Sequence, residues 1–195
     1  MHHTGMPAAK ALEKLKEGNK NYLDAARNPG DVSKEIRKKT CDEGQFPYAI
    51  VVTCSDSRVI PEAVFSAGIG EIFTIRVAGN VMDNHQLGSV QYAAEHLGTR
   101  LVVVLGHTHC GAVGAAMGGG EPEEYVKTIT DEIKKAIAGE TGENAACRKN
   151  VENSVEMIRE RLGYKGGDDG AVNTVGAVYD IESGEVEFLK TAVTT

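Results

Sequence analysis

The sequence predicts an α/β fold: a short, mainly parallel β-sheet flanked by α-helices, with an antiparallel edge strand and an N-terminal helical arm. Short apolar runs rich in β-branched residues alternate with longer segments whose apolar residues recur at helical spacing. That alternation is typical of a parallel sheet with helical crossovers. Residues 172–190 instead read as two strands around the turn Glu182-Ser183-Gly184, which would add the antiparallel edge.

The first part of the chain predicts the helical arm, residues 7–39. Residues 7–27 form its first helix, because apolar residues recur among Lys and Glu and Pro7 suits a first turn. Residues 28–31, Asn-Pro-Gly-Asp, break that helix, and a short polar helix follows to about Lys39. The recurring apolar residues are Leu12, Leu15, Tyr22 and Leu23. Residues 1–6 would be a disordered or tag-derived tail, since His2 and His3 look like part of an expression tag.

The rest of the chain alternates strands and helices. A Gly-Pro loop is expected at 118–122, and neither an internal repeat nor a long linker divides the chain, so residues 1–195 are expected to form a single domain. The expected strands are 49–53, 71–79 and 101–105, and the expected helices are 88–98, one that starts at Gly111, 123–138 and 144–162.

Composition excludes several classes of function. The net charge of −7 disfavours binding to nucleic acid or to an anionic membrane. The sequence contains no apolar run of transmembrane length and no signal-peptide core at its start, so a cytoplasmic protein is expected. Thiols stay reduced in that compartment, which makes metal ligation or plain burial the better explanation for the cysteines. These are Cys41, Cys54, Cys110 and Cys147.

A cysteine and a histidine follow two of the expected strands. Cys54 comes directly after 49–53, and His107 follows 101–105 by one glycine. Carboxyl ends of parallel strands meet at one edge of a sheet, so the two residues can approach each other. Cys110 lies three residues after His107 and would share its face if the chain coils into the following helix. His109 would then point about 100° away and act as a bystander or supporting group.

Cys54, His107 and Cys110 together make a three-ligand set. Thiolates disfavour calcium and magnesium and favour zinc (Zn²⁺). Three protein ligands leave one position open, which is typical of catalytic zinc. The alternative is that the cysteines are simply buried, as cysteine often is without any metal. Cys41 and Cys147 have no ligand-spaced partner and are expected to be dispensable.

An acidic and a basic residue follow Cys54 closely. Asp56 and Arg58 can form a bidentate ion pair. Asp56 could accept a hydrogen bond from a water molecule at the open position, or swing in as a fourth ligand, and Arg58 would hold it back. The alternative is a surface ion pair of little energetic weight. Backbone N–H groups near Gly111, at a helix start, could stabilise negative charge that develops on oxygen.

The motifs CSDSR at 54–58 and GHTHCGAV at 106–113 together resemble β-class carbonic anhydrases, in particular compact microbial members with plant-like active-site residues. The resemblance covers nearly the whole chain and implies zinc on Cys54, His107 and Cys110, with an Asp56–Arg58 dyad beside it. Further matching stretches are GNKNYL, GQFPYAIVVTCSDSRV, IRVAGN, GSVQYAAEHLG and VGAVYDIESGEVEF.

The resemblance also implies a substrate pocket and an activity. Gln45, Phe73 and Tyr92 match residues that line the carbon dioxide pocket, partly from a partner subunit, so a homodimer or higher homo-oligomer is expected. The implied enzyme is a carbonate dehydratase, a lyase that converts carbon dioxide to bicarbonate and a proton. Alternatives are a hydrolase of carbonyl sulfide or carbon disulfide, and a non-catalytic zinc protein closed by Asp56. His85 and His109 are the candidates for a proton shuttle.

Overall fold

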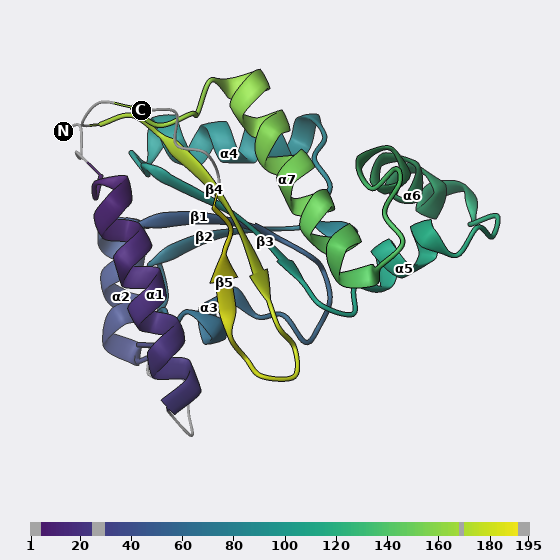
Figure 1. Ribbon diagram of the computed structural model, residues 1–195. Coiled ribbons are helices and arrows are strands. Elements are labelled where there is room, and N and C mark those ends of the chain that lie inside the picture. Colours follow the sequence, from purple (N-terminus) through teal and green to yellow (C-terminus); the bar gives the residue numbers. More distant parts are fainter. Residues whose placement is uncertain (1–4, 25–29, 168–169, 191–195) are drawn as a thin grey trace.

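A five-stranded sheet organises residues 5–24, 30–167 and 170–190, which are the residues that this computed structural model describes. The strand order is β2-β1-β3-β4-β5, parallel throughout except for the antiparallel β5 at one edge. This arrangement confirms the predicted fold class (Figure 1). The strands are β1 (Ala49–Thr53), β2 (Ile72–Arg76), β3 (Leu101–His107), β4 (Asn173–Tyr179) and β5 (Val186–Phe188).

Two layers of helices cover this sheet. On one face, α1 (Ala8–Asp24) and α3 (Pro61–Val64) pack against alternate side chains of β1 and β3. On the other face, α4 (Asn84–His96) and α7 (Glu143–Leu162) pack against the intervening side chains. Both faces of the parallel strands are therefore dry, which explains why β1 and β3 are continuous apolar runs rather than alternating ones.

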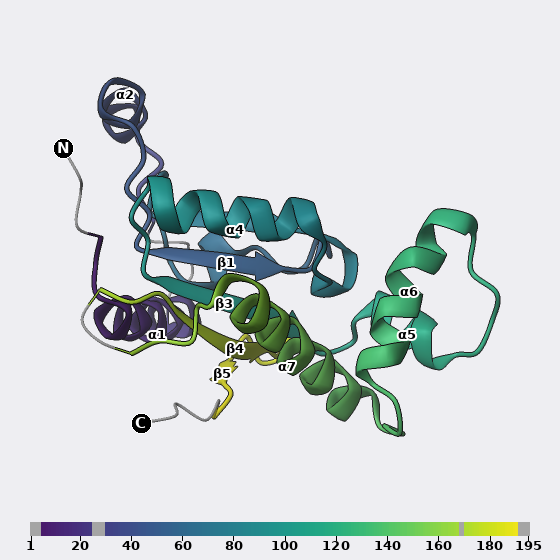
Figure 2. The ribbon, with the colours of Figure 1, turned by 90° about the horizontal axis from the view of Figure 1, so that it is seen from above.

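The two parts of the expected helical arm differ in their packing. Ala11 and Leu15 of α1 are fully buried against the sheet of the same chain. By contrast, α2 (Lys34–Glu43) has no buried residue and stands clear of both helical layers (Figure 2). Helix α2 ends at Glu43, four residues later than the predicted Lys39. His2, His3 and the end of the predicted first helix, residues 25–27, lie outside the described residues.

The carboxyl ends of the strands face a separate helical unit. There α5 (Gly111–Met117) and α6 (Glu124–Ala136) lie beyond the sheet, at the end opposite α1 and α2 (Figure 2). A third apolar cluster joins these two helices to the start of α7, and it includes Cys54 and Cys110. The strand ends and the helices α5 and α6 thus enclose the region in which the sequence predicts a metal site.

Several element boundaries differ from the predicted ones. Helix α4 begins at Asn84 rather than at residue 88, because the Asp83 side chain caps it and Gln86 completes the capping box. Strand β3 continues to His107, two residues beyond the predicted end.

Strand β2 ends earlier than predicted, at Arg76, because the chain turns there. The turn contains the short 3-10 helix η1 (Ala78–Asn80), in which Gly79 and Asn80 both have positive φ angles, of 67° and 45°. A left-handed backbone conformation cannot continue a strand.

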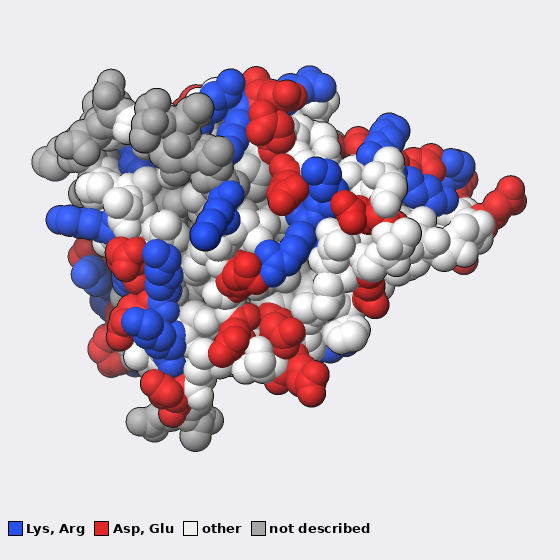
Figure 3. Space-filling view, in the orientation of Figure 1, with Lys and Arg blue, Asp and Glu red and all other residues white. Residues whose placement is uncertain are grey.

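The surface carries charges of both signs. In Figure 3, acidic and basic side chains are interspersed over the face drawn. In the part of the chain that the structure describes, none of the helices has both the length and the apolar character that crossing a bilayer requires.

Two glycines let α7 approach the sheet closely. A Cβ atom added at Gly106 of β3 would lie 2.4 Å from Cγ2 of Val151, and one added at Gly176 of β4 would lie 2.9 Å from Cγ1 of the same residue. Val151 is stiff because it is β-branched, and it is fully buried between the two glycines. The Val151 side chain therefore cannot move aside to make room for an added methyl group.

Gly106→Ala should consequently lower the free energy of unfolding by about 1–3 kcal/mol, the usual cost of overpacking a core. Chemical denaturation would measure the loss. Val151→Ala made in the Gly106→Ala background provides the control, because it removes the clashing methyl groups. The double variant should lose less stability than the two single variants added together. Simple additivity of the two losses would show that the contact is not the cause.

Candidate metal centre

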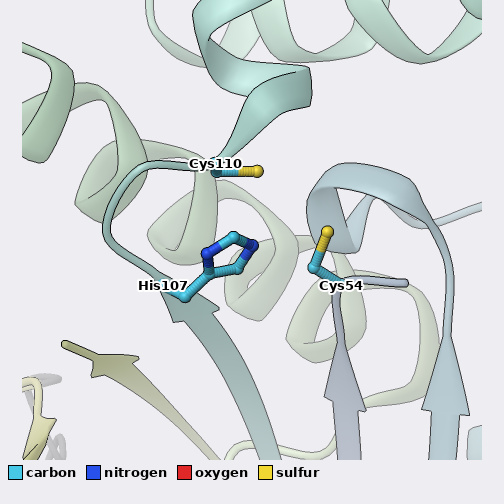
Figure 4. Close-up of side chains that lie close together, drawn as sticks. All are labelled: Cys54, His107 and Cys110. Atoms are coloured by element: carbon cyan, nitrogen blue, oxygen red, sulfur yellow. The ribbon is translucent and has the colours of Figure 1, made fainter. Parts of the chain in front are cut away.

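Three side chains converge at the carboxyl edge of the sheet. The Cys54 Sγ, a ring nitrogen of His107 and the Cys110 Sγ all lie within 4.8 Å of one another (Figure 4). Their residues are 5%, 1% and 2% exposed, so the donor atoms are almost fully removed from bulk water. The three predicted ligands are thus brought together, in a buried cluster of the size that a single metal ion needs.

The backbone reaches this arrangement differently from the sequence argument. His107 is the last residue of β3 and Cys110 is the N-cap of α5, so the two do not share a helical turn. The chain reverses between them through His109, whose φ is 55°. The prediction that helical i, i+3 spacing joins the two residues was therefore wrong, although the pair itself is close. His109 is exposed and lies outside the cluster, as expected.

The orientation of the His107 ring suits metal binding. Its Nδ1 lies 2.8 Å from the carbonyl oxygen of Thr108. A carbonyl oxygen can only accept, so Nδ1 carries the hydrogen and donates it. In the neutral ring, Nε2 then has a free lone pair, and this buried atom has no hydrogen-bond partner. A buried nitrogen that has a free lone pair and lies beside two thiols is suited to bind a metal ion.

The two sulfur atoms lie close enough to shift each other's pKa in opposite directions. The hydrogen bond from the Cys110 thiol is the main reason why the pKa of Cys54 falls to about 4, and the same contact raises the pKa of Cys110. Burial opposes a charge on His107, but the nearby sulfur of Cys54 raises the pKa of the ring overall. A cluster that already stabilises thiolate fits a soft divalent cation, since thiolate is the form that binds metal.

Asp56 and Arg58 form a bidentate pair at the edge of the cluster. Arg58 donates from Nε to Oδ1 of Asp56 at 3.0 Å and from Nη2 to Oδ2 at 2.7 Å. These bonds hold the pKa of the Asp56 carboxyl well below its usual range. Arg58 is itself anchored, because Nη2 also donates to the backbone oxygen of His109 at 3.1 Å. Oδ2 of Asp56 lies 4.0 Å from Nε2 of His107.

A second arginine, which the sequence argument did not single out, fixes the loop that carries Cys54 and Asp56. Arg76, the last residue of β2, donates from Nε to the carbonyl of Cys54 at 3.2 Å and from Nη2 to that of Asp56 at 2.7 Å. One planar guanidinium group thus ties the backbone of a predicted ligand to the backbone of the residue that carries the carboxylate. The motif IRVAGN contains this arginine, but only the fold shows which backbone it reaches.

Comparison with known proteins decides the family. A sequence model of the family described as carbonic anhydrase matches residues 49–186. The chain belongs to the carbonic anhydrase family. A carbonic anhydrase of Mycolicibacterium smegmatis is 34% identical, with 91% of each chain covered. Carbonic anhydrase 2 of Mycobacterium tuberculosis is 32% identical, with 89% of each covered. The predictions of a β-class carbonic anhydrase and of an enzyme are thus confirmed.

Solved structures share the fold. A β-carbonic anhydrase of Sordaria macrospora, described as tetrameric, superposes with a TM-score of 0.68 at 21% identity, over 94% of this chain and 95% of that one. A Coccomyxa β-carbonic anhydrase in complex with acetazolamide gives a TM-score of 0.67 at 21% identity, over 93% and 82%. At this level of identity the likeness concerns the fold alone.

The residues predicted to line the pocket of this carbonic anhydrase lie away from its own cluster. Phe73 pairs with Ile50 in the sheet register, whereas Cys54 follows Thr53. Cys54 lies four residues beyond the level of Ile50, which along a strand is about 13 Å. Tyr92 of α4 packs beside Phe73, with ring centroids 6.2 Å apart, and is 48% exposed.

Gln45 lies still further from the cluster, because it precedes the amino end of β1 and is exposed. Gly111, in contrast, directly follows Cys110 as the first residue of α5, and the space where its side chain would stand is open. Of the predicted substrate-binding residues, the described chain brings only Gly111 next to its own candidate ligands.

One cysteine set aside by the sequence argument turns out to be close to the ligands. Cys147 of α7 is 3% exposed and packs in the same apolar cluster as Cys54 and Cys110. Burial raises the pKa of its thiol, against the opposing effect of a hydrogen bond with the backbone of Cys110. Cys41 is exposed on α2, far from this cluster in the fold. Sequence spacing gave no signal for the position of Cys147.

Cys54→Ser should abolish tight zinc binding, because serine offers a hard and poorly ionised oxygen in place of a thiolate. Metal analysis after dialysis against a chelator would measure the loss. Cys41→Ser is the matched control and should retain the zinc content of the unmodified chain. Equal zinc content in the two variants would contradict the ligand assignment.

Proposed function

We propose that this carbonic anhydrase binds one zinc ion through Cys54, His107 and Cys110 and catalyses the reversible hydration of carbon dioxide to bicarbonate and a proton. The observation that carries the proposal is the buried three-ligand cluster with an ionised carboxylate, that of Asp56, at its edge. Zinc bound there would supply a Lewis acid that lowers the pKa of water toward neutrality.

The donor set favours zinc and an open site. Two thiolates and a neutral imidazole match a borderline-soft cation and are a poor match for calcium or magnesium. Three protein ligands leave a fourth position for water, as in other catalytic zinc sites. Both carboxylate oxygens of Asp56 are hydrogen-bonded to Arg58, which argues against Asp56 as a permanent fourth ligand. We therefore do not adopt the alternative of a closed, non-catalytic zinc protein.

Asp56 and Arg58 have separate tasks in this mechanism. Asp56 stays ionised because Arg58 lowers its pKa, so it can accept a hydrogen bond from the attacking water and orient the lone pair of that water toward the substrate carbon. Arg58 holds the carboxylate in place through two hydrogen bonds and is braced by the backbone of His109. N–H groups at the start of α5, near Gly111, are suited to stabilising negative charge on a substrate oxygen.

Carbon dioxide is the preferred substrate over carbonyl sulfide and carbon disulfide. The relatives that cover most of this chain are named carbonic anhydrases. These names support hydration of carbon dioxide and give no support to the hydrolase alternative.

We also propose that the chain works as a homodimer or a higher homo-oligomer. Phe73 and Tyr92 form an aromatic pair that is half open to solvent, and exposed Gln45 lies at the same amino end of the sheet. A pocket made by these residues needs a cluster from a second copy. The Sordaria macrospora structure is described as tetrameric, which agrees with an assembly of this kind.

Three further expectations stay predictions. Residues 1–195 are expected to form one zinc-enzyme domain, which the packing of both helical layers on a single sheet supports. The cytoplasmic location rests on the sequence argument. Of the two candidates for a proton shuttle, His85 and His109, both have exposed rings, and His109 is nearer the cluster in sequence.

Arg58→Ala should leave zinc content unchanged but lower the rate of carbon dioxide hydration by about 100-fold or more, because Asp56 is then free to occupy the open position. Stopped-flow hydration assays with metal analysis would measure both. Arg148→Ala is the control: it breaks a comparable surface pair, with Glu187, away from the cluster. It should keep near-normal activity. Asp56→Asn keeps the shape of the side chain and should retain some activity at high pH. Normal hydration by Arg58→Ala would show that the pair is only structural.

A mixture of two inactive variants should recover activity if the pocket spans two chains. Tyr92→Ala impairs the pocket and Arg58→Ala impairs the cluster, so a mixed dimer has one site with both defects and one site with neither. Random pairing of equal amounts should restore roughly a quarter of the sites in the whole mixture and roughly half of those in the mixed dimer. Coexpression with different tags, followed by a hydration assay of the purified mixed species, measures this. Inactive mixed dimers would place Tyr92 in the site of its own chain, and full activity of the Tyr92→Ala variant by itself would place it outside any site.

A further inference from the structure

A backbone N–H group, rather than a side chain, contacts the thiol of Cys54 from the η1 turn. The N–H of Gly79 donates to Cys54 Sγ at 3.3 Å. Gly79 has a φ of 67°, and a Cβ atom there would lie 2.6 Å from Cδ1 of Ile133. Residue 79 therefore has to be glycine, because its φ angle is positive and because a side chain there would lie too close to Ile133.

Two polar side chains of α7 hold this turn. Asn150 donates from Nδ2 to the carbonyl of Gly79 at 2.7 Å, and Ser154 donates from Oγ to the carbonyl of Asn80 at 3.0 Å. Asn150 is 2% exposed and Ser154 is 1% exposed. Because they are four residues apart, they lie on one side of the helix, beside each other. They fix the two successive peptide groups that follow the N–H group of Gly79.

These two residues interrupt an otherwise apolar face. Val151, Val155 and Ile158 of α7 pack into the core of the sheet. A buried amide or hydroxyl costs free energy unless it is hydrogen-bonded, and an apolar residue would pack here without that requirement. Both side chains direct their hydrogen bonds to the single turn that touches Cys54. This convergence points to a role beyond the stability of the helix.

We propose that Asn150 and Ser154 are positioning residues that hold the Gly79 N–H against the Cys54 thiolate and thereby tune the metal. This inference rests on the proposed binding of a metal by Cys54. A hydrogen bond to a metal-bound sulfur withdraws electron density from it and makes the metal a stronger Lewis acid. Two thiolates cancel the charge of a divalent cation, so a site of this composition depends more on such bonds than a three-histidine site does.

Cobalt(II) substitution provides the direct test, because its thiolate-to-metal charge-transfer band reports the electron density on sulfur. In Asn150→Ala this band should move to longer wavelength, and zinc affinity in chelator competition should fall about 10–100-fold. Asn150→Asp keeps the shape but places an acceptor against the Gly79 carbonyl, so it should show the same shift. A band position and a zinc affinity identical to those of the unmodified chain in both variants would overturn the proposal.

Two further variants separate positioning from a general loss of stability. Ile158→Val removes a methylene group from α7 two turns beyond Asn150 and should leave the cobalt band unmoved. Ser154→Ala removes a single oxygen atom and should shift the band in the same direction by a smaller amount. If the Asn150 variants do not fold, Ser154→Ala still tests the proposal. An unmoved band in Ser154→Ala would then count against it. A shift in Ile158→Val equal to that in Asn150→Ala would also count against it.

The proposed function can fail separately from this inference. If the unmodified chain binds cobalt with a thiolate band but does not hydrate carbon dioxide, the proposed activity is wrong, and the band shift still decides the role of Asn150. If the unmodified chain shows no thiolate band, Cys54 does not hold the metal, and the positioning proposal fails with it.

Discussion

The parallel pairing of β1 with β3 is the constraint on which the rest of the site depends. Thr53 pairs with Leu105 in the register, and the Thr53 hydroxyl also donates to the Leu105 carbonyl at 2.7 Å. Cys54 directly follows the end of β1, and β3 ends at His107, two residues after Leu105. A slip of one residue would turn every side chain of a strand to the opposite face. Because both faces are packed with apolar residues, such a slip is costly, so the core itself fixes the separation of two candidate ligands.

The candidate metal ligands are buried, whereas the charged side chains lie at the edge of the cluster. The sulfur and imidazole donors lie in an apolar environment, whereas Asp56 and Arg58 meet the solvent at its edge. A charged pair in the interior would have to overcome a large cost of desolvation. At the edge of the cluster, Arg58 keeps the Asp56 carboxylate ionised without the full cost of desolvation. It also holds this carboxylate toward His107. Arg76 then ties the backbone of Asp56 to that of Cys54, so the carboxylate moves with the ligand rather than independently of it.

The sequence predicts the chemistry of the site better than its backbone. The fold class and the three-residue cluster follow from apolar runs that each end in a ligand type, and these features are local. The sequence does not predict the reversal at His109, because only a few per cent of non-glycine residues have a positive φ and histidine is only somewhat enriched among them. The contact between Gly79 and Cys54 was missed because it joins segments 25 residues apart through a backbone atom. Residues such as Gln45, Phe73 and Tyr92 were identified only by resemblance, since nothing in their own chain brings them to the cluster.

Helix α7 links the stability of the fold to the geometry of the site. Its valines need the glycines of β3 and β4 in order to lie close to the sheet, and Asn150 precedes Val151 directly. The short side chain of Asn150 reaches the Gly79 carbonyl at 2.7 Å only because the helix axis is held this close. A side chain on a more distant helix would have to be longer, and it would lose more rotamer freedom on binding the turn. Because Gly106 and Gly176 have no side chains, α7 lies close to the sheet, and this closeness helps to hold the Gly79 N–H against the sulfur of Cys54.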